Sequence, residues 1–426
     1  MLTAEENARL TQVGPGTPMG ELMRRYWHPV AAGAELLDNP FRTKAVRLLG
    51  EDLVLFRDRA GHLGLIDRLC AHRRADLTYG VVEDDGLRCQ YHGWKYDGAG
   101  RCTEQPFEET VRPEAHFKDR ISLHGYRAEE LGGLIFAYLG PEPAPLLPHW
   151  GPLVWDNGVR DIAITELPCN WLQCQENSLD PVHVEWLHNY FWNYLRGLKG
   201  EGPVLSNGLR NVRRHQKIGF DLFEYGIIKR RVLEGFSEDD DDWKDGHPIL
   251  FPNILLVGSQ FSSTLQFRVP VDDSHTYHVS HYTYRAAPGA EAPAQERVPF
   301  RYVPLNDSRD RYILDYVFNQ DYSVWVGQGP IARRDLEKLG ESDRGIILFR
   351  QLCDQQMETV AQGDDPMNTF RDAATNVCLE PPLEHVKFGA RLRPQRYVPG
   401  EAGYSEAAAD IERVQATWDA TPAGSR

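Results

Sequence analysis

The sequence predicts an α+β fold, in which an N-terminal all-β domain is followed by an α+β domain with an antiparallel sheet. Short β-rich runs separated by hairpin turns begin at Lys44. A proline-dense segment at 140–148 cannot sustain a helix or a central strand. After this segment, strand-like and helix-like stretches are segregated, which is typical of α+β domains. The 426 residues are enough for two such domains.

The first 30 residues carry helical signals. Thr3 and Glu6 have the spacing of a capping box, and residues 19–27 have apolar side chains at helical spacing. We therefore expect helix before the β-rich region. In that region, turn signals separate four strand-sized apolar runs, at 46–49, 53–56, 63–66 and 87–89.

The proline-dense segment marks a stiff connector, and we place the domain boundary near residue 150. We expect residues 1–150 to form the helical segment and the β-domain, and residues 151–426 to form the second domain with a C-terminal tail. In the second domain we expect a helix around 170–195 and a second helical stretch from about 308 to 362. Alternating strand patterns occupy two further stretches, 254–257 and 275–284.

Two short loops each present one cysteine and one histidine. Cys70-Ala-His72 and Cys89-Gln-Tyr-His92 are separated by sixteen residues. A Rieske [2Fe–2S] cluster binds two Cys on one iron and two His on the other, and two adjacent hairpin tips that each supply one of each can clamp it. The alternative is a Cys2His2 zinc site, which usually groups its cysteines together and its histidines together. The mixed order therefore favours the [2Fe–2S] cluster.

Residues beside the second loop are candidates for tuning such a cluster. Tyr91, Gly93 and Trp94 lie within or next to it. Glycine lets backbone amides approach the cluster closely, and hydrogen bonds to sulfur set its potential. For Trp94 and Tyr96 the alternative is simple core packing, and the two roles are compatible.

A second group of candidate metal ligands lies beyond the connector. Asp180 precedes His183 by three residues, and His188 follows His183 by five. Asp180 and His183 lie on one helical face, but five residues of ideal α-helix turn His188 about 140° beyond a full turn. We therefore predict a π-bulge or an unwound step between the two histidines, a feature that often accompanies functional sites. The alternative is two histidines at a helix surface or satisfied in a core.

Both groups resemble the metal-binding motifs of Rieske non-heme iron oxygenases. The resemblance rests on loops 70–77 and 89–98 and on the pattern Asn-x2-Asp-x2-His-x4-His from Asn177 to His188. It implies a [2Fe–2S] Rieske cluster in the first domain, a mononuclear Fe(II) on the helices of the second, and catalytic roles for Asn177 and Asp180. By resemblance, Asp180 links a cluster histidine of a neighbouring subunit to an iron-ligating histidine.

Two histidines leave a 2-His-1-carboxylate iron site without its carboxylate. Asp321 lies on the segment where the family places its third ligand, so the resemblance implies that His183, His188 and Asp321 bind the iron. Asp315 and Asp335 are the alternatives, because the ligand rule requires a carboxylate without saying which one.

The resemblance covers most of the chain and is to the branch that contains phthalate dioxygenase and dehydrodivanillate O-demethylase. It implies an oxygenase (alpha) subunit that uses O2 to hydroxylate or O-demethylate an aromatic carboxylate. No Gly-x-Gly-x-x-Gly unit follows a strand, so electrons are expected from a separate reductase. The resemblance implies that this reductase is an NADH-dependent flavin and iron–sulfur protein. A trimer, or a hexamer of two stacked trimers, is the expected assembly. The alternatives are a Rieske electron carrier without oxygenase chemistry and a zinc-stabilised β-domain fused to a hydrolase.

An aromatic carboxylate substrate favours a guanidinium, which can pair with it in bidentate fashion. We select Arg213 and Arg230 as candidates. They belong to a group of five arginines early in the second domain, Arg210, Arg213, Arg214, Arg230 and Arg231. The alternative for each is a solvated strand face.

Composition bears on partners and location. The formal net charge of −15 and the pI near 5.5 argue against a nucleic-acid partner, because phosphate contacts need clustered Lys and Arg. The N-terminus shows no signal peptide, and the apolar runs are far shorter than the roughly 20 residues of a membrane helix. We expect a cytoplasmic protein with no membrane partner. Seven cysteines, an odd number, argue against a disulfide framework and favour buried free thiols.

Overall fold

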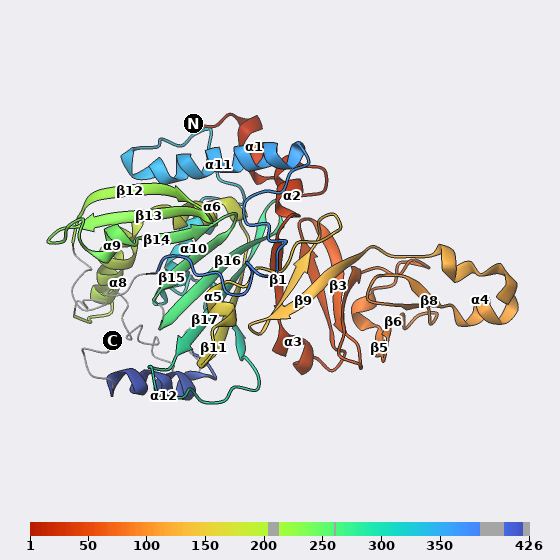
Figure 1. Cartoon of the computed structure of the whole chain (residues 1–426). Helices are drawn as coiled ribbons and strands as arrows, with labels where there is room; N and C mark the ends of the chain where they lie inside the picture. The colour runs from red at the N-terminus through yellow and green to blue at the C-terminus, as the bar shows by residue number, and fades with distance from the viewer. Residues whose placement is uncertain (203–212, 260, 384–403, 421–426) are drawn as a thin grey trace.

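The computed structural model describes residues 1–202, 213–259, 261–383 and 404–420. The chain forms a wide body from which a narrower lobe projects (Figure 1). Three sheets of six, four and eight strands form the framework, and helices cover the largest of them. The predicted α+β class is confirmed. Among the described helices, none is long and apolar enough to cross a membrane.

The first helix, α1 (Ala4–Thr11), begins at the predicted capping box. The Thr3 hydroxyl accepts from the Glu6 N–H at 3.2 Å, and the Thr3 N–H donates to the Glu6 carboxylate at 2.6 Å. The expected helix over 19–27 is wrong in its last turn. The second helix, α2 (Pro18–Met23), ends earlier, and the last predicted apolar position, Trp27, begins β1 (Trp27–Ala32), a strand whose residues are all buried.

The first sheet contains six antiparallel strands in the order β1-β10-β9-β4-β3-β2. Besides β1, its members are β2 (Thr43–Leu48), β3 (Glu51–Arg57), β4 (Leu63–Asp67), β9 (Gly125–Leu131) and β10 (Leu134–Tyr138). A short helix, α3 (Gly33–Asp38), follows β1. The runs predicted at 46–49, 53–56 and 63–66 correspond to β2, β3 and β4.

The second sheet has four short strands and lies toward the tip of the projecting lobe (Figure 1). Its strands are β5 (Val81–Glu83), β6 (Gly86–Arg88), β7 (Lys95–Tyr96) and β8 (Cys102–Glu104). The lobe also holds α4 (Pro106–Val111) and the 3-10 turns η1 (Leu77–Tyr79), η2 (Pro113–Ala115) and η3 (Phe117–Arg120). A hydrophobic core distinct from the main one fills this lobe and includes Cys70, Cys89, Trp94 and Tyr96.

The third sheet has eight strands in the order β12-β13-β14-β15-β16-β17-β11-β18. All neighbours are antiparallel except β11 and β18, which are parallel. The strands are β11 (Gly158–Leu167), β12 (His215–Phe223), β13 (Gly226–Leu233), β14 (His247–Leu250), β15 (Ile254–Gly258), β16 (Ser262–Asp272), β17 (His275–Arg285) and β18 (Phe300–Tyr302). The strands predicted at 254–257 and 275–284 are confirmed.

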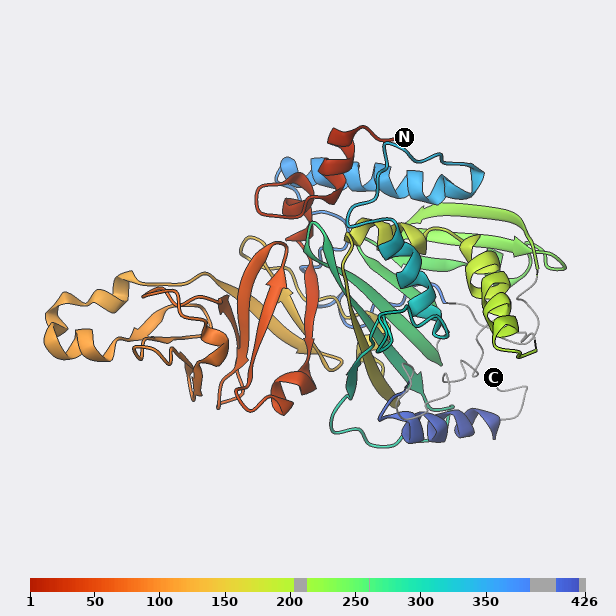
Figure 2. The ribbon, with the colours of Figure 1, turned by 180° about the vertical axis from the view of Figure 1, so that it is seen from behind.

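Most helices of the second half pack on this sheet, and Figure 2 shows α10 and α8 in front of it. The helical elements are α5 (Gly151–Val154), α6 (Trp171–Ser178), α7 (His183–Glu185), η4 (Trp186–Phe191), α8 (Trp192–Leu198), α9 (Asp241–Lys244), α10 (Val317–Gly327), η6 (Glu341–Asp343), α11 (Arg344–Ala361) and α12 (Ala408–Asp419). The helix expected around 170–195 is present with an interruption after Ser178. The helical stretch expected from 308 to 362 is wrong as a single unit. It is divided because Asp307 accepts the N–H groups of Arg309 and Arg311 in a turn, at 2.8 and 3.1 Å, and α10 ends before Gly329.

The connector predicted at 140–148 lies between β10 and α5. Isolated bridges join Leu146 to Phe370 and Trp150 to Leu379, so the connector is tied to the later chain. The main hydrophobic core includes residues from both sides of residue 150. The division of the chain at residue 150 stays a prediction.

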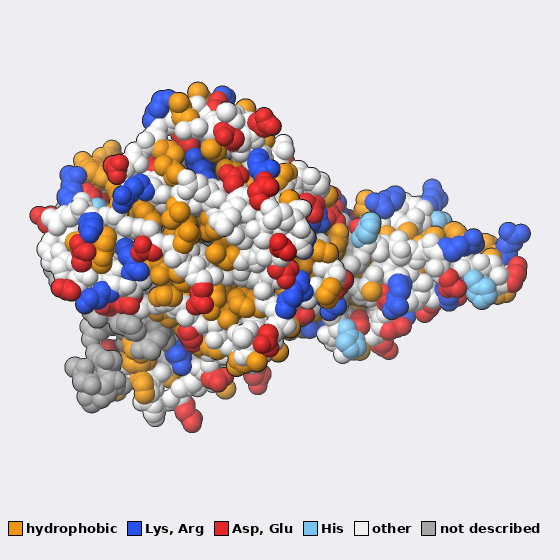
Figure 3. All heavy atoms as spheres, turned by 45° about the horizontal axis from the view of Figure 1, so that its top comes forward, with side chains coloured by type: hydrophobic (Ala, Val, Ile, Leu, Met, Phe, Trp, Pro, Cys, Tyr) orange, Lys and Arg blue, Asp and Glu red, His pale blue; other side chains and the backbone are white. Residues whose placement is uncertain are grey.

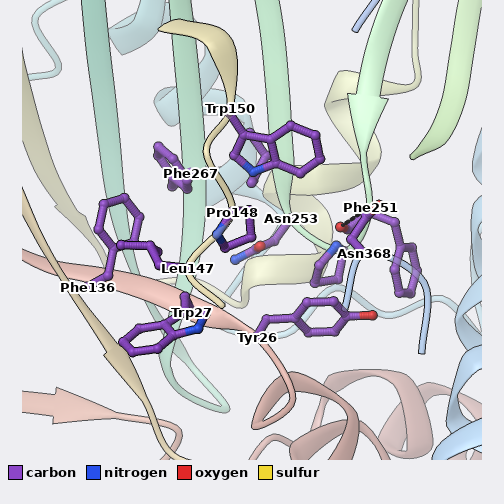
Figure 4. A pocket seen from close by; sticks show the side chains of 12 residues that line it. Tyr26, Trp27, Phe136, Leu147, Pro148, Trp150, Phe251, Asn253, Phe267 and Asn368 are labelled. Carbon is purple, nitrogen blue, oxygen red and sulfur yellow. Dashed lines mark hydrogen bonds between the residues drawn. The ribbon is translucent and has the colours of Figure 1, made fainter. Parts of the chain in front are cut away.

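A small cavity of about 20 Å³ lies where the six-stranded and eight-stranded sheets meet. Trp27, Trp150 and Asn253 are among the side chains around it (Figure 4). A space of this size holds about one water molecule. The junction between the two sheets is therefore closely packed.

The surface carries charges of both signs (Figure 3), and most of the cysteines are buried. On the face shown in Figure 3, acidic and basic side chains are interspersed. All seven cysteines are free, as expected, and six are buried. Cys378 is exposed, which differs from the expectation of burial. Cys169 and Cys174 are close, with 3.7 Å between their sulfur atoms.

Candidate metal centres

The two loops with the predicted cluster ligands have the same backbone form. The N–H of Cys70 donates to the carbonyl five residues later at 2.9 Å, and the Arg74 N–H donates back to Cys70 O at 2.9 Å. In the second loop, the Cys89 N–H donates to the Trp94 carbonyl at 2.8 Å, and the Gly93 N–H donates to the Cys89 carbonyl at 3.0 Å. Arg74 and Gly93 both have a positive φ, +57° and +75°. Each loop is therefore a closed turn that holds its cysteine and histidine in a fixed relation.

The four predicted cluster ligands lie together. Cys70 and Cys89 are 1% and 2% exposed, and the ring centroids of His72 and His92 are 4.4 Å apart. The hydrogen bond between the thiols lowers the pKa of Cys70 to about 5 and raises the pKa of Cys89. The Nδ1 atom of His72 is buried and has no hydrogen-bond partner among the described residues. Two thiols and two imidazoles, one with an orphaned nitrogen, fit a [2Fe–2S] Rieske cluster.

Two aromatic residues support this group. Trp94 stacks on His72, with centroids 4.5 Å apart and planes 10° apart. The hydroxyl oxygen of Tyr96 accepts from the Ala71 N–H at 3.2 Å and lies 3.2 Å from Cys70 Sγ, so its O–H is available to the sulfur. The sequence leaves a tuning role and simple packing open for Tyr96, and the contact with Cys70 follows from β7 lying beside the first loop.

The segment after Asp180 contains the predicted irregularity. The π-helix η4 follows α7 directly and continues into α8. In a π-turn the hydrogen bonds run between residues five apart, so such residues lie on one face. The rings of His183 and His188 have centroids 5.2 Å apart. The prediction of a π-bulge between these histidines is confirmed.

His183, His188 and Asp321 come together from three elements, α7, η4 and α10. Asp321 Oδ1 lies 3.6 Å from His183 Nε2 and 3.2 Å from His188 Nε2, and all three ligand atoms lie within 4.8 Å of one another. Burial alone raises the pKa of Asp321, but His188 and His183 lower it below its usual value. Its Oδ1 has no hydrogen-bond partner within the described chain. An ionised carboxylate beside two imidazoles fits a 2-His-1-carboxylate iron site.

Each histidine of this site has a different residue beside Nδ1, the ring nitrogen that does not face Asp321. Asp180 Oδ2 lies 3.6 Å from His183 Nδ1, and Asp180 Oδ1 accepts the main-chain N–H two residues later at 2.7 Å. Gln320 Oε1 lies 2.9 Å from His188 Nδ1, and the Gln320 amide nitrogen donates to Leu314 O at 2.9 Å. Such partners fix the orientation of metal-binding imidazoles. The sequence does not predict a role for Gln320, because a glutamine next to a metal-binding aspartate belongs to no recognised spacing of metal ligands.

Comparison with known proteins places both centres in one family. Residues 26–115 match the model of the Rieske [2Fe-2S] domain. The chain is 46% identical, over 389 residues, to the 5,5'-dehydrodivanillate O-demethylase oxygenase subunit of Sphingobium sp., covering 90% of this chain and 87% of that protein. The chain belongs to the Rieske non-heme iron oxygenases. The match to this oxygenase subunit extends across both metal centres.

A further curated relative and one solved structure are also similar to the chain. The Rieske oxygenase chain is 31% identical to the phthalate 4,5-dioxygenase oxygenase subunit of Pseudomonas putida, over 88% of this chain and 90% of that one. Its fold is similar to the solved structure of NdmA from Pseudomonas putida CBB5, with a TM-score of 0.58, 21% identity, and coverage of 80% and 93% of the two chains. Both of these curated relatives are named as oxygenase subunits.

A buried ion network anchors the iron-site helices of this Rieske oxygenase. Glu176, near the end of α6, pairs with Arg334 and Arg350, each at 2.7 Å. Burial alone raises the pKa of Glu176, but the two guanidiniums lower it. The next residue, Asn177, accepts the Asp180 N–H on its main-chain oxygen at 3.1 Å. The network therefore fixes the end of α6, from which the segment to His183 departs.

The structure does not bring the other predicted residues to the iron site. Arg213 donates to Glu234 O at 2.8 Å. Arg230 pairs with Asp221 at 2.6 Å and lines an open groove of about 440 Å³ beside Trp243. Arg210 lies outside the described residues. The alternative iron ligands also have other partners, Asp315 with Lys199 at 3.7 Å and Asp335 with Arg333 at 2.7 Å.

Proposed function

We propose that this oxygenase subunit uses O2 and reductase-supplied electrons to hydroxylate or O-demethylate an aromatic carboxylate. The observation that carries the proposal is the convergence of His183, His188 and Asp321, whose ligand atoms lie within 4.8 Å of one another. Two relatives act on such compounds according to their names, a dehydrodivanillate O-demethylase and a phthalate dioxygenase. They support a phthalate-like or a methoxylated, lignin-derived aromatic acid as the substrate.

The proposal assigns a role to each group of residues. Cys70, His72, Cys89 and His92 hold the [2Fe–2S] cluster, with Trp94 packed on one ligand. When bound by His183, His188 and Asp321, an Fe(II) ion supplies open coordination positions for O2, and the cluster supplies electrons one at a time. The protein's own residues position these groups. Asp180 orients His183, and Gln320 orients His188.

The proposal also covers partners and location. The reductase is an NADH-dependent flavin and iron–sulfur protein, and the oxygenase acts as a trimer or as a hexamer of stacked trimers. In such a ring, Asp180 connects a cluster histidine of one subunit to His183 of the next, because a closed heterologous interface brings unlike surfaces together. Asn177 belongs to the same catalytic segment. We place the domain boundary near residue 150 and the protein in the cytoplasm, where NADH is available.

The proposal is tested by turnover of an aromatic acid panel. The purified oxygenase is mixed with a Rieske oxygenase reductase, NADH and O2, and substrate loss, product and formaldehyde are measured. Consumption of an aromatic acid is expected, and formaldehyde selects O-demethylation over ring hydroxylation. His183→Ala serves as the control that removes one iron ligand and leaves the [2Fe–2S] loops intact. Absence of turnover with every aromatic acid, while the cluster is reduced by NADH, contradicts the proposal.

Iron content separates this function from electron transfer alone. Three irons per chain are expected for an oxygenase, two in the cluster and one at the second centre. A Rieske electron carrier binds only two. In this test a chelator empties the second centre. If the protein then keeps two irons and full electron transfer but no longer oxygenates substrate, the result supports the oxygenase assignment of that centre.

A further inference from the structure

A row of buried polar side chains crosses three strands of the eight-stranded sheet. Arg268 of β16 is paired with His278 of β17, and His278 is paired with Thr165 of β11. Residues directly opposite on adjacent strands share a face of the sheet. Arg268, His278 and Thr165 are 1%, 0% and 2% exposed. This face of the sheet therefore presents polar groups to the protein interior.

Helix α10 lies against this row through two aromatic side chains. The Tyr322 hydroxyl is 2.9 Å from His278 Nδ1, and the guanidinium carbon of Arg268 is 5.8 Å from the centroid of the Trp325 ring. Asp321 directly precedes Tyr322 and lies four residues before Trp325. Residues four apart on a helix are neighbours on one face. Arg268 therefore lies beneath the part of α10 that carries Asp321.

The Arg268 guanidinium has no carboxylate beside it. Its two terminal nitrogens donate to Gln266, one to the main-chain oxygen at 2.8 Å and one to the side-chain oxygen at 2.9 Å. Both acceptors are neutral. Among the described residues no carboxylate lies within ion-pair distance of Arg268, and its Nε has no hydrogen-bond partner. Arg334, which is equally buried, instead has Glu176 at 2.7 Å.

The electrostatic effects of this guanidinium agree with its position. Burial lowers the pKa of Arg268 to about 10, against the raising effects of Cys174, Tyr322 and Asp321, so the group stays charged at neutral pH. Of these three groups, only Asp321 is a carboxylate. At Asp321, burial raises the pKa, and the two histidines and Arg268 lower it. Burying a cation is costly, and Asp321 offsets part of that cost from across the helix.

We propose that the fixed positive charge of Arg268 favours Fe(II) over Fe(III) at the site formed by His183, His188 and Asp321. Coulomb repulsion from a fixed cation is stronger for a trivalent than for a divalent ion, and the protein interior screens it weakly. The charge acts across α10, so Arg268 is a positioning residue of the site. This inference rests on the iron site of the proposed function. It adds the group that selects the oxidation state in which such a site accepts O2.

The test compares Arg268→Met with Arg160→Met. Arg160 is a partly buried arginine of β11 in the same sheet, and its guanidinium donates to the Trp155 carbonyl at 2.6 Å. Its strand partner, Thr283, lies five residues, or about 17 Å, along β17 from His278. The variant Arg160→Met therefore makes the same chemical change away from α10.

Each protein is loaded with Fe(II) and taken through an anaerobic redox titration without substrate, in which the paramagnetic resonance signal of mononuclear Fe(III) is followed. We expect Arg268→Met to shift the equilibrium toward Fe(III) about tenfold, which lowers the potential of this one-electron couple by about 59 mV. Arg160→Met and wild type have equal potentials, and Arg268→Lys, which keeps the charge, stays close to wild type. The potential of the [2Fe–2S] cluster is the same in all four proteins.

The outcomes separate this inference from the proposed function. Equal mononuclear iron potentials in wild type and Arg268→Met overturn the role of Arg268 and leave the function intact. Failure of wild type to bind a third iron overturns the iron site and the function with it. If Arg268→Met does not fold, Arg268→Lys decides, because it changes the shape of the side chain and keeps its charge. A tenfold shift toward Fe(III) in Arg268→Lys contradicts a role of the charge.

Discussion

His188 and Gln320 form a hydrogen bond of 2.9 Å between the imidazole Nδ1 and the amide oxygen. The Gln320 amide nitrogen donates to Leu314 O, so the orientation of the amide is set. This pattern assigns the proton to Nδ1 and leaves Nε2 free to face Asp321 at 3.2 Å. His183 instead has a carboxylate, Asp180, as its outer partner. The two histidines of the candidate iron site therefore have one neutral and one anionic neighbour beside Nδ1.

We expect Gln320→Leu to weaken iron binding at the second centre by about tenfold to a hundredfold, because His188 loses its orienting acceptor. The [2Fe–2S] cluster is unaffected. Titration of the iron-depleted protein with Fe(II) measures the effect, together with total iron. Gln328→Leu, an exposed position just after the same helix, is the matched control. Equal iron affinity in both variants contradicts a positioning role for Gln320.

For Asp180→Asn we expect both metal centres to remain loaded while coupled turnover is lost. The amide keeps the shape of the side chain but removes the charge that faces His183 Nδ1 at 3.6 Å. Iron analysis and stopped-flow reduction of the second centre measure the two effects separately. Loss of the mononuclear iron would show that Asp180 is a ligand and not a bridge.

Removal of the hydroxyl in Tyr96→Phe is expected to lower the reduction potential of the [2Fe–2S] cluster. Hydrogen bonds to the sulfur ligands favour the reduced cluster, and loss of one charge-assisted bond corresponds to roughly 50 to 100 mV for a one-electron couple. A spectroscopic redox titration measures the shift. Tyr79→Phe alters an exposed tyrosine of the same lobe and provides the control. A potential equal to that of wild type would rule out the contact with Cys70.

Glu176→Gln is expected to destabilise the protein by about 3 to 5 kcal/mol, because two buried guanidiniums lose their shared carboxylate. Chemical denaturation measures the change, with Glu341→Gln, at an exposed position, as the control. The pKa of Glu176 is lowered from 4.5 in the fold, so its contribution is present above about pH 4.5 and is lost as the pH falls through the lower, folded-state value. The stability difference between Glu176→Gln and wild type therefore shrinks in acid. A difference that is constant with pH contradicts this origin.

Much of both centres is predictable because ligand spacing is local. The pairs Cys70 with His72 and Cys89 with His92 identify the first centre, and the five-residue step from His183 to His188 demands the π-turn that the structure contains. The remaining features depend on distant segments. Strand pairing places Lys229 on the face that packs against α11, while Arg230, equally basic and one residue away, faces the other side. Periodicity alone cannot say which face of a strand a helix will cover.

The matched turns at Cys70 and Cys89 have a consequence for how the first centre fills. One iron of the cluster takes both sulfurs and the other takes both nitrogens, while each loop donates one of each. Neither loop alone therefore supplies both protein ligands of either iron. Both turns must be formed before either iron of the cluster can have its full set of protein ligands.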